Sequence, residues 1–278
     1  MRIVKFPKGN GTYRTLYVPS RREREAIRRL LPDLRTQAQA SCSPALVHGF
    51  LPGRSPVTNA EAHIGWCYTL SFDLADFFDH VTHGSLVRAG YPLNPRKKRQ
   101  LLMPDQRARQ GLATSPFLAN IAGSVLDTRI LEAIEYAGIH TVYTRYADDL
   151  AFSYDEPHIT RILKQLIPTV CDQYDFPVNP AKTRLQSATS GRRVICGVAV
   201  DDSGLLPTRR TKRRLRAALH QEHARQAARL REWMSLKPPR SRYDARDPLP
   251  SPSLPAPRHA SLPVRPLTLP RRYAFDES

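Results

Sequence analysis

This chain has few acidic residues for its number of basic ones, and it has no long apolar run. It holds 25 Asp and Glu against 43 Lys and Arg, a formal net charge of +18 at pH 7. Such an excess of positive charge indicates a polyanionic partner, with nucleic acid ahead of an anionic membrane surface. No apolar run approaches the ~20 residues that a membrane-spanning helix needs, and the first residues lack the apolar segment of a secretory signal. We therefore expect no membrane partner.

Cysteine is also scarce. The four residues Cys42, Cys67, Cys171 and Cys196 are scattered and form no C-x-x-C pair. This pattern argues against a zinc site and against a disulfide framework, and it predicts reduced, mostly buried thiols in a cytoplasmic protein. With 278 residues, 41% of them hydrophobic, the chain is long enough for one large or two modest domains with a real core.

The stretch YTRYADDLAFS (143–153) places two adjacent carboxylates, Asp148 and Asp149, between two runs of β-forming residues. The pattern predicts a strand–turn–strand hairpin with the acids at its tip. Neighbouring carboxylates repel each other, so a shared cation is one explanation for the pair, and a solvated acidic turn is the other. Hard ions such as Mg²⁺ are commonly held by one or two carboxylates together with substrate phosphates.

A second acidic site lies in SFDLADFF (71–78), which reads as a buried strand ending at Asp73. If Asp73 and Asp148 converge, they can share two metal ions about 4 Å apart, an arrangement that stabilises the attacking and leaving oxygens of a phosphoryl transfer.

Three segments in order, FDLADFF (72–78), RQGLATSPFLAN (109–120) and YADD (146–149), resemble the palm motifs of reverse transcriptases. NAEAH (59–63) resembles the NAxxH signature of retron reverse transcriptases, and HGFLPGRS (48–55) resembles the stretch before their catalytic strand. The resemblance extends over roughly residues 3–220. It implies an α+β right-hand polymerase with fingers, an antiparallel palm sheet backed by helices, and an abbreviated helical thumb.

The same resemblance implies a division of the chain. Residues 1–67 would form the fingers, and residues 68–204 the palm with a fingers insertion at about 84–112. Residues 205–236 would form a basic helical thumb. Prolines recur throughout 237–278, so we expect this tail to be disordered or polyproline-like, because such a composition cannot bury a core.

The resemblance implies the chemistry residue by residue. Asp73, Asp148 and Asp149 would be the catalytic carboxylates, and with the main-chain carbonyl of Leu74 they would hold two Mg²⁺ ions, with Mn²⁺ as an alternative. The residues expected at the incoming nucleotide are Lys5, Arg14, Phe78, Gln110 and Lys182. For the cations among them the competing interpretation is a surface role, and for Phe78 it is a place in the core beside Phe77.

The basic segment after residue 207 resembles the start of a retron thumb. A helix this basic is expected to lie against an RNA–DNA backbone, with binding that weakens steeply as salt rises. The residues expected to bind nucleic acid are Arg209, Arg210, Lys212, Arg213, Arg214 and Arg216.

Other segments give local expectations. Residues 48–67 are rich in Gly and Pro and read mostly as loop, and His63 is expected to be a capping or core residue. Ser20 with Glu23 forms a capping-box pattern before an amphipathic helix. Thr114 or Ser115 is expected to cap a helix that starts at Pro116.

The expected function is that of an RNA-directed DNA polymerase of retron type, with a structured RNA template, an RNA–DNA hybrid, dNTPs and an effector protein as partners, in anti-phage defence. One alternative is another bacterial reverse transcriptase, related to group II introns or to defence systems. The other is a decayed, non-catalytic RNA-binding protein. The sequence Ile195-Cys196-Gly197 stands where retrons commonly read VTG, which places retron-specific RNA recognition in question.

Overall fold

The computed structural model describes residues 2–7, 13–102 and 105–237. The sequence Lys8-Gly9-Asn10-Gly11, which is typical of a turn, and nearly all of the proline-rich tail lie outside the described residues. Within the described part, no helix combines the length and apolar character needed to cross a membrane.

A four-stranded antiparallel sheet forms the centre, in the order β4-β5-β3-β6. Its strands are β3 (Tyr68–Asp73), β4 (Val142–Tyr146), β5 (Asp149–Tyr154) and β6 (Arg184–Ser187). The strands β4 and β5 form the predicted hairpin, and β3 ends at Asp73 as predicted. Because β3 pairs with β5, the two acidic segments lie on neighbouring strands.

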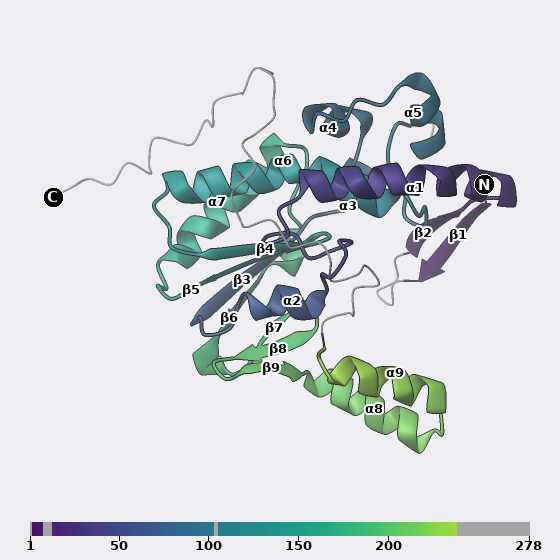
Figure 1. The fold of residues 1–278 in the computed structure, drawn as a ribbon. Helices are drawn as coiled ribbons and strands as arrows, with labels where there is room; N and C mark the ends of the chain where they lie inside the picture. Colours follow the sequence, from purple (N-terminus) through teal and green to yellow (C-terminus); the bar gives the residue numbers. More distant parts are fainter. Residues whose placement is uncertain (1, 8–12, 103–104, 238–278) are drawn as a thin grey trace, which may run out of the picture.

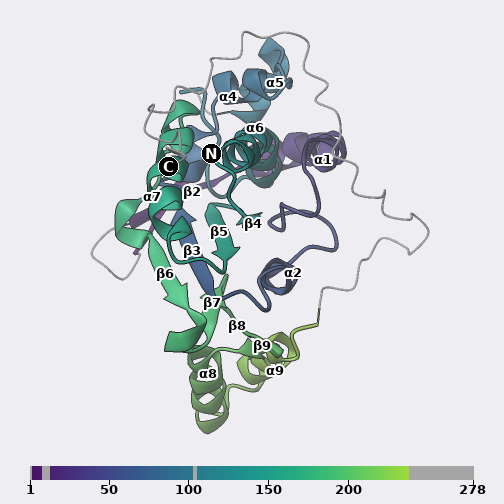
Figure 2. The same cartoon turned by 90° about the vertical axis from the view of Figure 1, so that its left-hand side faces the viewer.

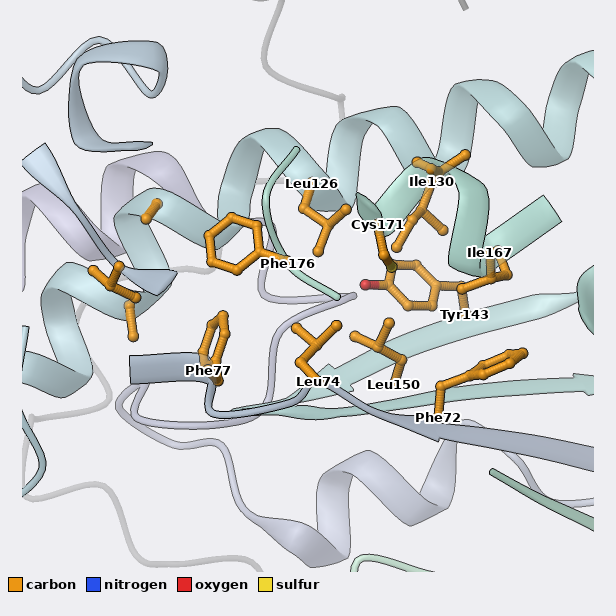
Figure 3. Close-up of a cluster of buried hydrophobic side chains, with 14 of the residues drawn as sticks. Phe72, Leu74, Phe77, Leu126, Ile130, Tyr143, Leu150, Ile167, Cys171 and Phe176 are labelled. Carbon is orange, nitrogen blue, oxygen red and sulfur yellow. The ribbon is translucent and has the colours of Figure 1, made fainter. Parts of the chain in front are cut away.

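Two long helices, α6 (Ser115–Tyr136) and α7 (Ile159–Gln173), cover one face of this sheet (Figure 1). Phe72 and Leu150 from the strands pack against Leu126 and Ile167 from the helices, and all four side chains are buried (Figure 3). The helix α7 continues through Pro168 to Gln173, so this proline does not shorten it.

The opposite face carries α2 (Pro56–Glu61) and a three-stranded antiparallel sheet of β7 (Arg193–Ile195), β8 (Val198–Asp201) and β9 (Gly204–Pro207) (Figure 1). Residues 48–67 are mostly loop, as expected, and the short helix α2 within them was not foreseen. Ser55 caps this helix, with its hydroxyl accepting from two backbone N–H groups, and Pro56 occupies a first-turn position that needs no N–H donor.

The N-terminal hairpin of β1 (Arg2–Pro7) and β2 (Tyr13–Val18) precedes α1 (Arg21–Ser41), which has the predicted capping box of Ser20 and Glu23. The hairpin docks on the segment before α6, where Tyr17 N–H donates to Gln110 O at 2.9 Å. Gly111 has φ +100°, and a Cβ there would lie 2.7 Å from Tyr17 O, so only glycine permits this approach.

Three short helices, α3 (Phe77–His80), α4 (His83–Arg88) and α5 (Pro95–Leu101), lie between β3 and α6. The helix α6 begins at Ser115, and neither expected cap forms. The Thr114 side chain makes no capping bond, and the Ser115 hydroxyl donates to Arg109 O at 2.7 Å.

Two basic helices, α8 (Arg209–His220) and α9 (Ala224–Met234), end the described chain below β7–β9 (Figure 2). They pack on each other through Leu215, Ala218, Ala227 and Leu230. Glu222 has φ +55°, and the chain reverses there. Two short 3-10 turns, η1 (Pro180–Lys182) and η2 (Ala188–Ser190), flank β6.

Candidate active site

Three acidic residues lie at one end of the central sheet. Asp73 ends β3 and Asp149 begins β5, and the two are direct partners in the antiparallel register. Asp148 lies in the turn between β4 and β5, and its carbonyl accepts the Leu74 N–H at 2.9 Å. The structure thus places acidic residues that are far apart in the sequence on neighbouring strands and in the adjoining turn.

The assembly concentrates negative charge. Asp149 is accessible to solvent, but the protein packed around it removes part of its hydration. This partial burial raises the pKa of Asp149 to about 6, and the neighbouring charges of Asp148 and Asp73 act in the same direction. Both effects disfavour the ionised carboxylate, so a cation that binds here relieves an existing electrostatic cost.

Lys182 neutralises part of this charge. Its Nζ lies 2.8 Å from both carboxylate oxygens of Asp73, and the hydrogen bond to Asp73 raises the pKa of the lysine. The 3-10 turn that carries Lys182 is tied to the same residue, because Asn179 N–H donates to Asp73 O at 2.7 Å. The lysine therefore stands directly beside the carboxylates.

The carboxylates suit a divalent metal, although they do not form a closed cage. Within the described residues, no three His, Cys, Asp or Glu side chains are grouped so as to hold a metal ion as they stand. Carboxylate oxygens are nevertheless the ligands that hard divalent ions prefer, and Mg²⁺ typically takes only one or two of them together with water and substrate phosphates. The donor set of Asp73, Asp148 and Asp149 fits such a site.

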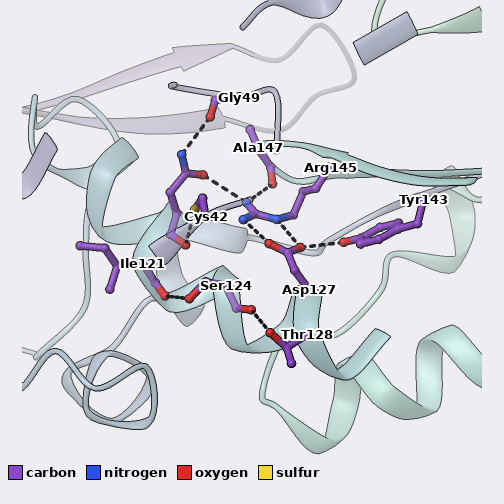
Figure 4. Close-up of polar contacts among 10 residues, drawn as sticks. Cys42, Gly49, Ile121, Ser124, Asp127, Thr128, Tyr143, Arg145 and Ala147 are labelled. Carbon is purple, nitrogen blue, oxygen red and sulfur yellow. Dashed lines mark hydrogen bonds and ion pairs between the residues drawn. The ribbon is translucent and has the colours of Figure 1, made fainter. Parts of the chain in front are cut away.

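A buried ion pair supports the turn that carries Asp148 (Figure 4). Arg145 on β4 is fully buried and forms a two-pronged contact with Asp127 on α6, at 2.8 and 2.7 Å. The Tyr143 hydroxyl donates to the same carboxylate at 2.7 Å. Arg145 also donates to Asn120 at 3.2 Å and to the carbonyl of Ala147, next to Asp148, at 3.4 Å.

Two glycines make room for this arrangement. A Cβ on Gly123 would lie 3.0 Å from the Arg145 guanidinium carbon, and a Cβ on Gly49 would lie 2.5 Å from Ala147 N. Ala147 itself has φ +57°, an uncommon conformation for a residue with a side chain. Gly49 is further held by Asn120, whose amide donates to its carbonyl at 2.9 Å. Sequence reasoning missed this network, although a charged residue inside an apolar strand was a usable signal.

Apart from Lys182, which contacts Asp73, the expected nucleotide-binding residues lie at separate places in the structure. Phe78 is half-buried between Phe50 and the core residue Phe77. Gln110 is half-buried where β2 docks, and Lys5 is exposed on β1. Arg14 lies on β2, but its side chain is outside the described part.

The six expected nucleic-acid-binding residues all lie on α8. Lys212 is half-buried, and the other five are exposed: Arg209, Arg210, Arg213, Arg214 and Arg216. The first turn of α8 holds no acidic residue. The helix therefore presents concentrated positive charge beyond the edge of the β7–β9 sheet (Figure 2).

Among known families, the chain matches "Reverse transcriptase (RNA-dependent DNA polymerase)" over residues 6–223. The chain belongs to the reverse transcriptase family. As members of this family depend on divalent metals, the carboxylate cluster is the natural candidate for the metal site.

Curated relatives support the retron resemblance that the sequence motifs predict. The chain is 35% identical over 240 residues to the retron Mx65 reverse transcriptase of Myxococcus xanthus, covering 78% of this chain and 54% of the relative. It is 30% identical over 253 residues to the retron Mx162 enzyme of the same organism, covering 77% and 51%. The chain thus spans about half the length of these relatives.

Solved structures confirm the fold class. Telomerase from Candida albicans, solved with a fragment of telomeric RNA, aligns with a TM-score of 0.55 at 14% identity, covering 74% of this chain and 45% of that one. A truncated telomerase from Candida tropicalis aligns with a TM-score of 0.53, covering 74% and 54%. The α+β polymerase fold expected from the sequence is therefore correct.

We predict that Asp127→Asn lowers the free energy of unfolding by about 3–5 kcal/mol, because it leaves the Arg145 guanidinium buried without its counter-charge. Denaturant unfolding monitored by circular dichroism measures the change. The matched control is Glu25→Gln, which removes the carboxylate of the exposed Arg21–Glu25 pair and should change stability little. Equal effects of the two substitutions would contradict the bracing role of Asp127.

The raised pKa of Asp149 predicts a pH-dependent gain in stability for Asp149→Asn in metal-free buffer. When the pKa of a carboxyl group is higher in the folded chain than in the unfolded chain, the free energy of unfolding falls as pH rises. For Asp149 this loss is complete above about pH 6. The variant cannot ionise, so its melting temperature should exceed that of the wild type at pH 8, and the difference should shrink toward pH 4. Asp172→Asn, on the exposed side of α7, should show no such trend. A wild type that is more stable than Asp149→Asn at pH 8 without metal would refute the prediction.

Proposed function

We propose that this chain contains the catalytic core of an RNA-directed DNA polymerase that extends a primer hydroxyl with dNTPs on an RNA template. The observation that carries the proposal is the direct pairing of Asp73 with Asp149 beside the Asp148 turn, in a chain that belongs to the reverse transcriptase family. Both acidic segments and the segment around Gln110 coincide with motifs that resemble the palm of this family.

The residues that would hold Mg²⁺, as two ions, are Asp73, Asp148, Asp149 and the carbonyl of Leu74. Mn²⁺ is the alternative ion. When bound, such ions lower the pKa of the primer hydroxyl and neutralise charge on the transferring phosphoryl group. Asp149 contributes best above pH 6, where it is ionised in the folded chain.

Lys182 is proposed to serve the leaving group. In the structure it pairs with Asp73, and its exposed, flexible side chain can turn from this carboxylate toward an arriving triphosphate. Lys5 and Arg14, on the N-terminal hairpin, would cover the triphosphate, where charge-assisted hydrogen bonds fit phosphate. Gln110 would contact the incoming nucleotide. The half-buried ring of Phe78 would lie under the sugar and exclude a 2′-hydroxyl.

We propose the following regions on this basis. Residues 1–67 form the fingers, 68–204 the palm with an insertion at about 84–112, and 205–236 a short thumb of α8 and α9. The thumb would bind the RNA–DNA hybrid through Arg209, Arg210, Lys212, Arg213, Arg214 and Arg216, whose positive charge complements phosphate.

The retron relatives support a narrower proposal, in which a structured RNA serves as template and the product is single-stranded DNA linked to RNA. If the chain is a retron reverse transcriptase, it would act in anti-phage defence together with an effector protein. A different bacterial reverse transcriptase would share the chemistry and differ in its RNA. A decayed protein that binds RNA without polymerising would retain the basic surface alone.

Asp148→Asn should abolish magnesium-dependent extension of a DNA primer on an RNA template, because it removes a carboxylate from the metal site. Extension is measured with labelled primer, and RNA binding is measured in parallel by filter retention. Asp172→Asn is the control, since it makes the same change on the exposed side of α7. Wild-type protein that binds RNA but incorporates no nucleotide with any divalent ion would show that the binding-only function is correct.

The basic helix α8 makes a second prediction. Replacing Arg213 and Arg216 with Gln should reduce the slope of log K against log salt for hybrid binding by about one unit for each of the two arginines that binds a phosphate. Titrations across a range of salt concentrations measure this slope. The control is Lys164→Gln, an exposed cation on α7, for which an unchanged slope is expected. If the double variant keeps the wild-type slope, these two arginines of α8 do not bind phosphate.

A further inference from the structure

The short helix α2 lies between the carboxylate hairpin and the β7–β9 sheet (Figure 1). It contacts β4 on one side and β7, β8 and β9 on the other. Its residues Val57 and Ala60 pack with Ala151 of β5 and with Ile195 and Val198. The NAEAH segment (59–63), to which the polymerase chemistry assigns no role, forms the end of this helix and the turn that follows it.

His63, at the end of this segment, joins both strands of the hairpin. It is fully buried; its Nδ1 lies 2.8 Å from the Ser153 hydroxyl on β5, and its Nε2 lies 2.7 Å from the Thr144 hydroxyl on β4. Burial lowers the pKa of His63 to about 3, so the ring stays neutral, with one nitrogen as donor and the other as acceptor. The predicted core role of His63 is confirmed.

Asn59 reaches the carboxylates through a cysteine. Its amide nitrogen donates to Cys196 Sγ at 3.4 Å, and that thiol donates to Asp149 Oδ2 at 3.9 Å. Cys196 lies in the turn between β7 and β8 with φ +47°, an uncommon conformation for a residue with a side chain. The hydrogen bonds of Cys196 to Asn59 and to Asp149 hold this turn beside the carboxylate.

The Asn59 side chain is costly to bury. It is 1% exposed, and its Oδ1 has no hydrogen-bond partner among the described residues. An unsatisfied buried acceptor destabilises a protein relative to an apolar side chain of similar size. A position selected for stability alone would carry an apolar residue, so the amide points to a role in placing the groups that it contacts.

We propose that α2 is the positioning element of the carboxylate site: Asn59 holds Cys196 against Asp149, while His63 fixes the two hairpin strands on which Asp148 and Asp149 are carried. These three residues act through Asp148 and Asp149 and contact no substrate. The inference rests on the proposed polymerase function, and it assigns a role to the NAEAH segment and to the Ile195-Cys196-Gly197 turn, which meet in one contact.

The test compares single-turnover primer extension by Asn59→Ala, Cys196→Ala and the double variant. Each single change should lower the maximal rate about tenfold with little change in the KM for dNTP, because the carboxylate is misplaced while the nucleotide contacts remain. The double variant should be no slower than the slower single variant, because both remove the same contact.

Cys171→Ala is the matched control for loss of a buried thiol. Cys171 lies on α7 in the main core, so the change should lower the melting temperature and leave the rate per folded molecule intact. A wild-type rate for Cys196→Ala, or losses that multiply in the double variant, would overturn the proposal. So would an equal loss of rate in Cys171→Ala.

Hydrogen exchange gives a readout that does not depend on polymerisation. In substrate-free protein, Asn59→Ala should speed amide exchange across residues 147–150 and leave α7 unchanged. If wild-type protein does not polymerise but this local change occurs, the proposed function fails and the positioning role stands. If wild-type protein polymerises and the exchange at 147–150 is unaltered, only the positioning role fails.

Discussion

The antiparallel register of β3 on β5 is the constraint on which the rest of the structure depends. It places Asp73 opposite Asp149 with Asp148 in the adjoining turn, so three like charges are held together at the end of one sheet. A slip of one residue would turn one carboxylate to the opposite face of the sheet. Burial, together with this repulsion, raises the pKa of Asp149, and the surrounding structure must hold the three groups in place against the repulsion.

Support comes from both faces of the sheet. On the helical face, the buried Arg145–Asp127 pair links α6 to β4 and reaches the carbonyl of Ala147. On the other face, α2 contributes Asn59 to the contact with Cys196, and the turn after α2 contributes His63 to both hairpin strands. Polar contacts of this kind are directional, so they specify one arrangement of the turn where apolar packing would allow several.

Negative and positive charge are concentrated at separate places in the structure. The carboxylate cluster carries the concentrated negative charge, with Lys182 beside it, while the exposed arginines of α8 lie at the far side of the β7–β9 sheet (Figure 2). A polymerase needs this separation, because its metal site must attract cations while a neighbouring surface attracts the phosphate backbone.

The sequence by itself determined the hairpin, the strand ending at Asp73, the capping box before α1 and the family, because these depend on local patterns of residues. It did not determine α2, whose proline and serine cap lie in a stretch that reads as loop, or the start of α6, where Thr114 forms no cap. Only the tertiary structure decided that Arg145 pairs with Asp127, that Gly49 and Gly123 leave room for this contact, and that Asn59 meets Cys196. Those contacts join segments far apart in the chain, and their partners are set by how the helices pack on the two faces of the sheet, which no local pattern of residues encodes.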